Sequence, residues 1–411
     1  MSKGVVHPAD VQRSQTPPAT DRPKTPRVLD GIICFGGEDW WYHNRGHYDM
    51  QMMRELSKSV PVLYVNSIGM RMPQIREGSM FLARVNRKLR SFFHGLKVVR
   101  PNFGVFSAIS IPKFRDSWIG RRSLAWQVKR AARQMNIRQP LLWIACPPAA
   151  EALSLFSQIV SVYQRTDRFE EFPGVNPIQI SDYDKQLKDA AELTLFCSSY
   201  LYNIEHTHCR NASFIDHGVD YDRFSRAGTN ALEPNDVKHI VRPRVGFIGG
   251  IDSHTFDPNL FLDVAGRLPD YSFVMVGACS LPKDWCQLPN VYFLGRKVYD
   301  AVPDYMASCD VLIMPWNQNE WIRACNPVKL KEYLAIGRPI VSTPFDELKQ
   351  YDGSVYIANN ASDFSNGIRN ALTTPYDPNQ FRQLVEEETW RSKAEQVVEE
   401  LRTRNVHFSS S

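Results

Sequence analysis

Short apolar runs alternate with segments of helical spacing along most of this chain. The apolar run at 28–37 ends in two glycines, the segment at 47–59 then carries Met and Leu at helical intervals, and a β-branched run follows at 60–66. Further apolar runs of strand length lie at 140–146, 159–167, 191–199 and 212–220. Strands that alternate with helices indicate a parallel sheet covered by helices on both faces.

The pattern stops at a polar, turn-rich stretch, 222–241, and then starts again. Strand-like runs follow at 244–250, 271–278, 291–297, 310–316, 339–343 and 355–358. We therefore predict an α/β fold of two doubly wound, Rossmann-like domains facing across a cleft, because such sheets bind ligands beyond the carboxyl ends of their strands. The predicted parts are a disordered tail (1–26), an N-terminal acceptor domain (27–225), a linker (226–241), a C-terminal donor domain (242–378) and a long helix (379–405) that packs back across both domains.

The composition is that of a globular protein. Of 411 residues, 43% are apolar and 23% are charged, and no apolar run approaches the roughly 18 residues that span a bilayer. The eight cysteines occur singly. With no export signal at the N-terminus, we expect reduced thiols and a cytoplasmic protein. His206, His208 and Cys209 have no second ligand cluster at finger spacing, so we expect no metal.

Positive charge is concentrated in one stretch of the first domain. Between Arg71 and Arg138, sixteen Lys and Arg are opposed only by Glu77 and Asp116, although the net charge of the whole chain is only +5. Aromatic residues are interleaved with these cations. The pattern favours an anionic membrane surface as a partner of region 71–138. Nucleic acid is an unlikely alternative, and a solvated face with a few ion pairs is a third interpretation.

The segment NPVKLKEYLAIGRPIVSTP (326–344) contains the clearest candidate chemistry. Asn326 can cap a helix that Pro327 starts, which places Lys329 and Glu332 on its first turn at the edge of the cleft. There, a lysine can neutralise a diphosphate and a carboxylate can accept the hydroxyls of a ribose. Arg323, in the polar loop before the helix, is a second phosphate candidate. The alternative is an exposed ion pair at i,i+3 that stabilises the helix by only about 0.2–0.5 kcal/mol.

A glycine pair follows the first strand of the second domain. In GFIGGIDSHTFDPNL, Gly249 and Gly250 end a strand, and Asp257 and Pro258 suit the cap and first position of the next helix. Glycines there allow backbone N–H groups to approach a phosphate near a helix N-terminus. A plain tight turn would use the same residues.

These motifs resemble those of GT-B glycosyltransferases of the group-1 (family-4-like) kind, which include teichuronic-acid and capsule enzymes. The resemblance rests on VKLKEYLAIGRPIVST, preceded by CDVLIMPW, and extends over about residues 28–405. It implies metal-independent transfer without a cofactor. It also implies donor binding by residues of the second domain, namely Gly249, Gly250, Arg323, Asn326, Lys329 and Glu332. The sequence departs from the family pattern at Ala324, where a glutamate is usual, and at 251–253, where basic residues are usual.

The first domain has its own candidates. Asp167 closes the strand-like run at 159–167, and in similar inverting enzymes an aspartate at this place is the general base for the acceptor hydroxyl. A helix cap or a salt bridge with a neighbouring arginine is the alternative role. Arg45, His47 and His217 are candidates for the acceptor side, whereas Trp40 and Trp41 could hold a sugar or belong to the core.

From these observations we expect a glycosyltransferase that uses a UDP- or GDP-sugar. Its acceptor would be a sugar or a lipid-linked glycan of cell-surface polysaccharide synthesis, reached at the inner face of the cytoplasmic membrane. The alternatives are a sugar-nucleotide binder that has lost catalysis, motivated by Ala324, and a sugar-nucleotide epimerase. The sequence leaves retention or inversion of configuration open.

Overall fold

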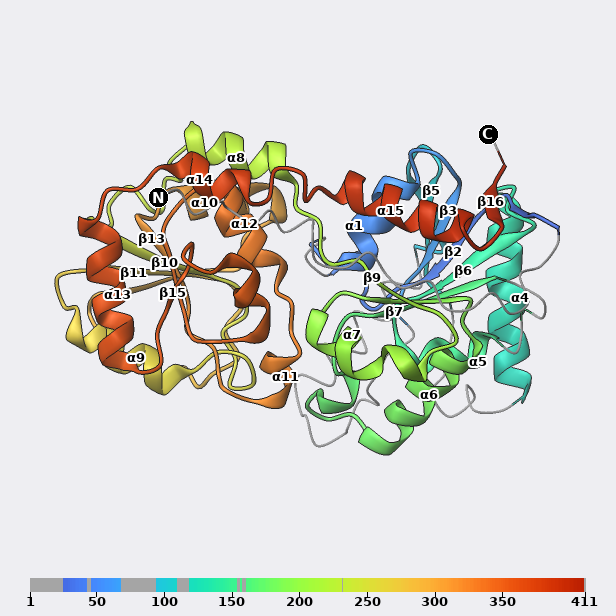
Figure 1. Ribbon diagram of the computed structural model, residues 1–411, viewed down its shortest axis with the longest axis horizontal. Coiled ribbons are helices and arrows are strands. Elements are labelled where there is room, and N and C mark those ends of the chain that lie inside the picture. Colours follow the sequence, from blue (N-terminus) through green and yellow to red (C-terminus); the bar gives the residue numbers. More distant parts are fainter. Residues whose placement is uncertain are drawn as a thin grey trace, which may run out of the picture.

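The computed structural model describes residues 25–42, 46–67, 94–108, 118–153, 156, 160–230 and 232–409. Most of the predicted tail, Arg45 and half of the sixteen cations of region 71–138 lie outside these residues. Figure 1 shows two α/β lobes side by side, with the C-terminal helix α15 lying across the first.

The first lobe is built on an eight-stranded sheet of order β4-β5-β3-β2-β6-β7-β8-β9. Its strands are β2 (Gly31–Phe35), β3 (Val62–Val65), β4 (Leu96–Arg100), β5 (Phe103–Phe106), β6 (Pro140–Ile144), β7 (Ser161–Arg165), β8 (Leu193–Phe196) and β9 (Ala212–Phe214). Every pair is parallel except β4 with β5. Helices α1 (Tyr48–Leu56), α4 (Trp118–Gln134), α5 (Ala150–Leu153), α6 (Pro177–Ala190) and α7 (Ser199–Glu205) connect these strands. Continuous apolar strands such as β2, β3 and β6 are buried along their whole length, as a sheet covered on both faces requires.

The second lobe has a six-stranded parallel sheet of order β12-β11-β10-β13-β14-β15. Its strands are β10 (Arg244–Ile248), β11 (Ser272–Val276), β12 (Val291–Gly295), β13 (Val311–Met314), β14 (Ile340–Ser342) and β15 (Tyr356–Ile357). Helices α8 (Tyr221–Thr229), α9 (Pro258–Arg267), α10 (Val302–Ala307), α11 (Glu320–Arg323), α12 (Val328–Ile336), α13 (Ala361–Thr373) and α14 (Pro378–Gln383) belong to this lobe. The two sheets confirm the predicted pair of doubly wound domains.

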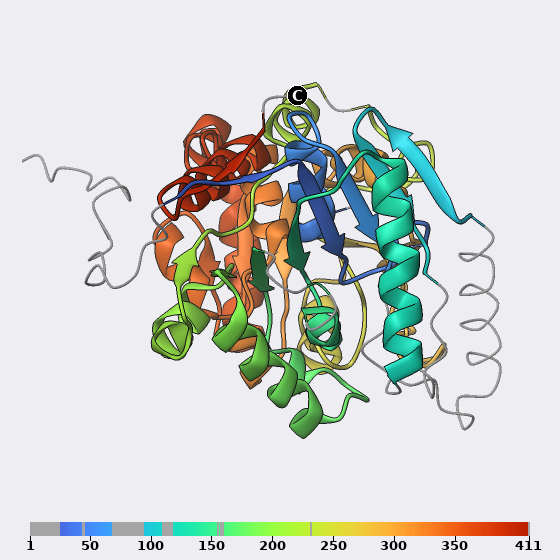
Figure 2. The same ribbon diagram turned by 90° about the vertical axis from the view of Figure 1, so that its right-hand side faces the viewer.

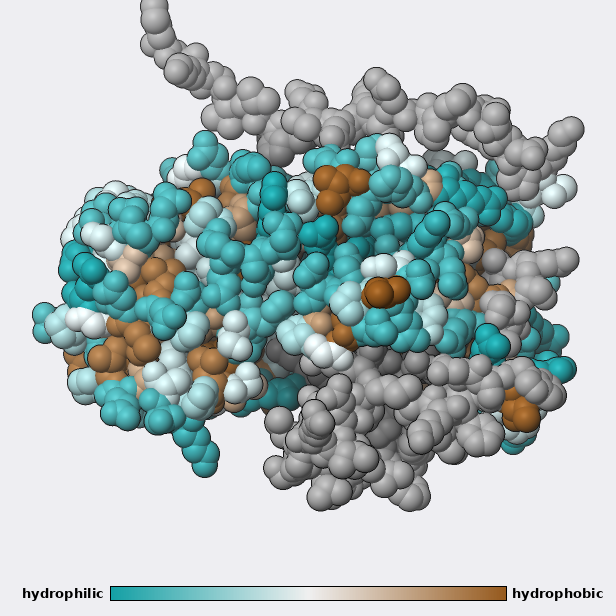
Figure 3. All heavy atoms as spheres, turned by 90° about the horizontal axis from the view of Figure 1, so that it is seen from below, coloured by the Kyte–Doolittle hydropathy of each residue, from teal (hydrophilic) through white to brown (hydrophobic). Residues whose placement is uncertain are grey.

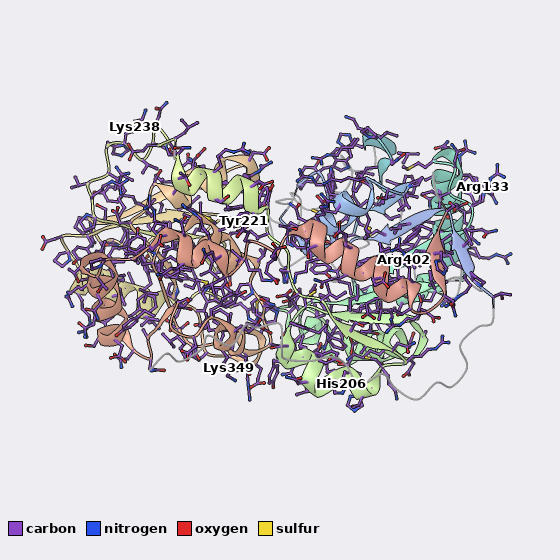
Figure 4. The ribbon with its side chains drawn as sticks, turned by 45° about the horizontal axis from the view of Figure 1, so that its top comes forward. Arg133, His206, Tyr221, Lys238, Lys349 and Arg402 are labelled. Carbon is purple, nitrogen blue, oxygen red and sulfur yellow. The ribbon has the colours of Figure 1, made fainter. Side chains whose placement is uncertain are left out.

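The boundary between the lobes differs from the predicted linker, 226–241. Helix α8 already begins at Tyr221, and Phe224 and Ala227 are buried in the core of the second lobe. A side chain at Gly228 would overlap the carbonyl oxygen of Ile336, so α8 lies directly against α12. The apolar stripe of α8 therefore moves the boundary to the residues just before it, and Figure 4 shows Tyr221 near the junction of the lobes.

The C-terminal segment is two helices rather than the one predicted at 379–405. Helix α14 packs on α12, where Arg382 donates to the carbonyl of Ile336 at 3.1 Å, and α15 (Trp390–Arg402) packs on α1 of the first lobe. After α15, β16 (Val406–Phe408) pairs in parallel with β1 (Arg27–Leu29). The described C-terminal end of the chain thus lies beside β1 (Figure 2). Thr389 caps α15 through its side chain, which explains the break before it.

Candidate functional site

The start of α12 contacts residues that follow strands of both sheets: Asn326 donates to Cys197, just after β8, and Lys329 lies against Gly249, just after β10. Helix α12 begins at Val328 and ends at Gly337, whose left-handed φ of 79° suits a glycine. Seven of its nine residues are buried, including Glu332. Lys329 and Glu332 are therefore fixed by a helix that packs on nearly all sides.

Lys329 occupies a pocket of glycine backbone and aromatic rings. A side chain at Gly249 would overlap the Nζ atom of Lys329, so the glycine is needed for this approach. The Nζ atom lies 4.8 Å from the ring centroid of Phe247 and 5.3 Å from that of Trp316. Within the described ranges the ammonium group has no ion-pair partner. Burial lowers its pKa to about 8, against the opposing influence of Glu332.

Glu332 is nearly as isolated. The side chain of Tyr299 donates to its Oε1 at 3.3 Å, and no ion pair joins Glu332 to Lys329 among the described residues. Burial raises the pKa of Glu332 to about 7, although Lys329 and the hydrogen bond from Tyr299 act in the opposite direction. The two residues are thus a partly buried cation and a buried anion, not the exposed i,i+3 pair that was the alternative.

The helix start differs in one respect from the prediction. Pro327, not Asn326, takes the cap position of α12, and no side chain caps it. The Asn326 amide instead donates to the carbonyl of Cys197 in the first lobe at 2.7 Å. By contrast, the predicted cap of α9 is confirmed, since Asp257 accepts from the amide of Leu260 at 3.0 Å.

Arg323 is the last residue of α11, and its side chain contacts residues other than Lys329 and Glu332. Its guanidinium group is 4.9 Å from the ring centroid of Tyr200 and 3.7 Å from Glu320. It lines a hollow of about 410 Å³ whose lining includes neither Lys329 nor Glu332. The structure therefore does not bring Arg323 together with the predicted phosphate site.

Asp167 follows β7 and faces the second lobe. Burial and, after it, the charge of Asp167 raise the pKa of the Cys325 thiol, which belongs to the loop just before α12, so Asp167 lies within electrostatic range of that loop. Neighbouring Arg165 pairs instead with Glu170 and Glu205, at 3.0 and 3.1 Å, and within the described part of the chain Asp167 has no ion pair. Burial raises the pKa of Asp167 to about 6. A carboxylate with this pKa is suited to proton transfer near neutral pH.

The remaining first-lobe candidates have different surroundings. His217 is packed between Tyr48 and Trp390, with ring centroids 5.4 and 6.1 Å away, and burial lowers its pKa to about 3. His47 directly precedes α1 and is exposed. Trp40 is a core residue, with 2% of its surface exposed.

Two features of this region had no signal in the sequence pattern. One is Tyr299. The other is a buried cluster of four charges at the crossover between the lobes. Lys331 of α12 contacts Asp216 at 2.6 Å and Glu388 at 2.6 Å, and Lys393 of α15 contacts the same two carboxylates at 2.6 and 2.5 Å. Asp216, Lys331 and the pair Glu388 and Lys393 come from three distant parts of the sequence, so only the fold joins them.

No metal cluster or membrane span appears in the part of the chain that the structure describes. No group of three or more His, Cys, Asp or Glu is placed to hold an ion there. No helix of the same part is long and apolar enough to cross a bilayer. On the face shown in Figure 3, polar side chains separate the apolar ones.

Comparisons with known proteins agree with this architecture. Residues 242–374, in the second lobe, match the family model of group-1 glycosyl transferases, the family that the sequence resembles. A putative teichuronic acid biosynthesis glycosyltransferase, TuaH of Bacillus subtilis (strain 168), is 29% identical over 223 residues. This alignment covers 49% of this chain and 55% of that protein, so it spans only about half of the relative.

Solved structures extend the similarity to nearly the whole fold. Sucrose-phosphate synthase from Thermosynechococcus elongatus has a TM-score of 0.65 at 13% identity, covering 91% of this chain and 98% of that one. HepE from Anabaena, in complex with UDP and glucose, has a TM-score of 0.63 at 14% identity, with 91% and 100% covered. The fold is therefore GT-B, as predicted.

Proposed function

Starting from a group-1 glycosyltransferase domain in a GT-B fold, we propose that this protein transfers a glycosyl group from a nucleotide-diphosphate sugar to an acceptor. The observation that carries the proposal is a pair of charges at the start of α12, the partly buried ammonium of Lys329 and the buried carboxylate of Glu332, which form no ion pair with each other among the described residues. An ammonium and a carboxylate removed from water each cost free energy unless a partner compensates them. A nucleotide diphosphate supplies both partners, an anion for Lys329 and hydroxyl donors for Glu332.

The proposed donor is a UDP-sugar, with a GDP-sugar as the other candidate. Complexes of HepE with UDP and with UDP-glucose support this class of donor. Gly249 and Gly250 would let the diphosphate reach Lys329, whose ammonium group would stabilise the leaving diphosphate as negative charge develops. Asn326 and Arg323 would contribute to donor binding only indirectly, because their side chains are directed to the first lobe.

Asp167 is the proposed general base of the transfer. Its carboxylate would take the proton of the acceptor hydroxyl while that oxygen attacks the anomeric carbon, which implies inversion of configuration. Its place within electrostatic range of Cys325, directly before the helix that holds the donor, supports this role. His47 and His217 are proposed to contact the acceptor side; His217 would act there in its neutral form.

The proposed acceptor is a lipid-linked glycan of cell-surface polysaccharide synthesis at a membrane surface. The name of the TuaH relative supports the pathway class, and helix α4 supports the surface. This helix has five basic and no acidic residues, namely Arg121, Arg122, Lys129, Arg130 and Arg133. Ile119 and Trp126 on the same helix are 52% and 62% exposed. Figure 4 shows Arg133 on the outer side of the first lobe, away from the second. A basic face with exposed apolar side chains fits an anionic bilayer.

A thermal-shift screen across UDP-, GDP- and ADP-sugars tests the proposed donor. A bound nucleotide should stabilise the fold by about 2.7 kcal/mol at a hundredfold excess over its Kd. The Glu332→Ala variant should lose this shift, whereas Glu387→Ala, at an exposed position before α15, should keep it. No shift with any nucleotide would contradict the proposal. Binding without hydrolysis or transfer to any acceptor would favour a non-catalytic binder, and donor conversion without an acceptor would favour an epimerase.

A further inference from the structure

Tyr299 is the side chain that reaches the proposed ribose carboxylate from outside α12. It begins the short turn Tyr299–Ala301, which follows β12 in the second lobe. Its hydroxyl donates to Oε1 of Glu332 at 3.3 Å. This is the hydrogen bond that the structure provides to the Glu332 side chain among the described residues.

Neighbouring residues pack against the ring of Tyr299 on several sides, so its hydroxyl is the group through which it contacts Glu332. Phe224 of α8 meets the ring edge-on, with centroids 6.2 Å apart, and the guanidinium of Arg223 lies 5.9 Å from the ring centroid. From the first lobe, Gly46 approaches so closely that a Cβ there would be 3.2 Å from the ring edge. A ring fixed in this way cannot easily offer a face to a nucleobase.

Arg223 is in turn fixed by carboxylates near the crossover. It pairs with Asp220 at 3.0 Å and with Asp300, the residue next to Tyr299. Asp220 directly precedes α8, where the chain passes from the first lobe to the second. A continuous series of contacts therefore runs from the crossover through Arg223 and Tyr299 to Glu332.

We propose that Tyr299 is a positioning residue, which orients the Glu332 carboxylate toward the ribose hydroxyls of the donor and is itself held in place by Arg223. The inference rests on the proposed function, because it assigns a supporting residue to the proposed donor site. It adds a contact from a separate part of the second lobe to the site that α12 provides.

Removing the Tyr299 hydroxyl should change the pKa of Glu332, in a direction set by the surrounding groups. Lys329 on the same helix and the Tyr299 hydroxyl lower the pKa of Glu332, while burial and the charge of Asp220 raise it. Among the described residues, removing the hydroxyl leaves the charge of Lys329 as the remaining influence that favours the ionised form of Glu332. The carboxylate would then both lose its orientation and stay protonated to a higher pH.

The test compares Tyr299→Phe with a matched control, Tyr305→Phe. Tyr305 lies on α10 and donates to Asp236 at 2.8 Å, so its variant also loses a tyrosine–carboxylate hydrogen bond but not one at the site. We expect Tyr299→Phe to bind UDP about tenfold more weakly near pH 7, as for a lost hydrogen bond to a charged group, with the acid limb of binding shifted to higher pH. Tyr305→Phe should bind UDP as the wild type does. Wild-type affinity and pH profile in Tyr299→Phe would overturn the inference.

A second measurement does not depend on any ligand. In a double-mutant cycle of Tyr299→Phe and Glu332→Gln, the shifts in Tm of the unliganded protein should be non-additive at pH 8.5, where Glu332 is ionised, and closer to additive at pH 5. Additive shifts at both pH values would overturn the inference. If the wild type binds no nucleotide, the proposed function fails, and this cycle still decides whether Tyr299 and Glu332 are coupled.

Discussion

The Nζ atom of Lys329 occupies the space that a side chain at Gly249 would fill. The glycine that follows β10 and the lysine on the first turn of α12 are 80 residues apart in sequence, yet the lysine can take this position only because the other residue is a glycine. A cation is thereby placed against bare backbone at the carboxyl edge of the sheet.

Gly249→Ala should weaken donor binding without unfolding the protein. The overlap is with the far end of a flexible side chain, so Lys329 can move away, but its ammonium group then leaves the proposed phosphate position. We expect UDP affinity to fall roughly tenfold or more, as for a lost charge-assisted contact. Calorimetry measures this effect. Gly266→Ala on α9, where nothing lies within 4 Å of the added carbon, is the control and should leave affinity unchanged.

Donor binding should have a maximum between pH 7 and 8. Below about pH 7 the Glu332 carboxylate takes up a proton and can no longer accept two hydroxyls, and above about pH 8 Lys329 loses its charge. Glu332→Gln should remove the acid limb, and Lys329→Met should remove the alkaline limb. UDP affinity measured from pH 5.5 to 9.5 tests this. A profile that is flat across the range in the wild type would contradict it.

Asp167→Asn should separate chemistry from donor binding. We expect transfer to fall by about 10²–10⁴-fold, the usual contribution of a general base, with UDP affinity unchanged. In the wild type, the rate should decrease as pH falls below about 6, because the base is then protonated. Asp189→Asn, at the exposed end of α6, is the matched control. Equal loss of binding and of transfer would assign Asp167 a structural role instead.

Asp216→Asn should destabilise the crossover. Lys331 and Lys393 are 2% and 5% exposed and would lose a shared carboxylate, which typically costs about 3–5 kcal/mol for a buried pair broken on one side. The lysines hold the pKa of Asp216 at about 2, below its unfolded value. Its stabilisation is therefore complete above about pH 4 and disappears as pH falls through 2. Urea unfolding of the wild type and of Asp216→Asn at pH 7 and at pH 3 measures this loss of stability. If the variant has the same unfolding midpoint as the wild type at pH 7, the prediction is wrong.

Charge removal on α4 should release the protein from anionic vesicles. A variant with Arg122, Lys129, Arg130 and Arg133 changed to Gln should lose most binding to phosphatidylglycerol vesicles, since each cation adds about 1 kcal/mol near such a surface. Trp126→Ala should weaken binding less. The control removes the same charge from exposed positions of the second lobe, at Lys238, Lys283, Lys349 and Arg369. Equal losses in both variants would point to net charge rather than to this helix.

Much of the architecture could be predicted because it depends on local pattern. The alternation of apolar runs with helical segments is a property of consecutive residues, and it predicted both sheets. The ends of α12 could also be predicted from the sequence, because Pro327 precedes the helix and only a glycine easily adopts the left-handed φ of Gly337. The position of Lys329 and Glu332 at the start of that helix follows from these ends. Where a local rule failed, as for the Asn326 cap, a long-range contact competed with it: the amide bonds to Cys197 instead.

The sequence by itself determined which elements form and which charged residues stand at their ends. Only the tertiary structure decided which of those charges are paired. Arg323 and Asn326 turn toward the first lobe, Lys331 joins Asp216 across 115 residues, and Lys329 is left with aromatic rings and glycine backbone. The physical reason is that burial and pairing depend on groups brought together by folding, and these set the free energy of a charge far more than its neighbours along the chain do.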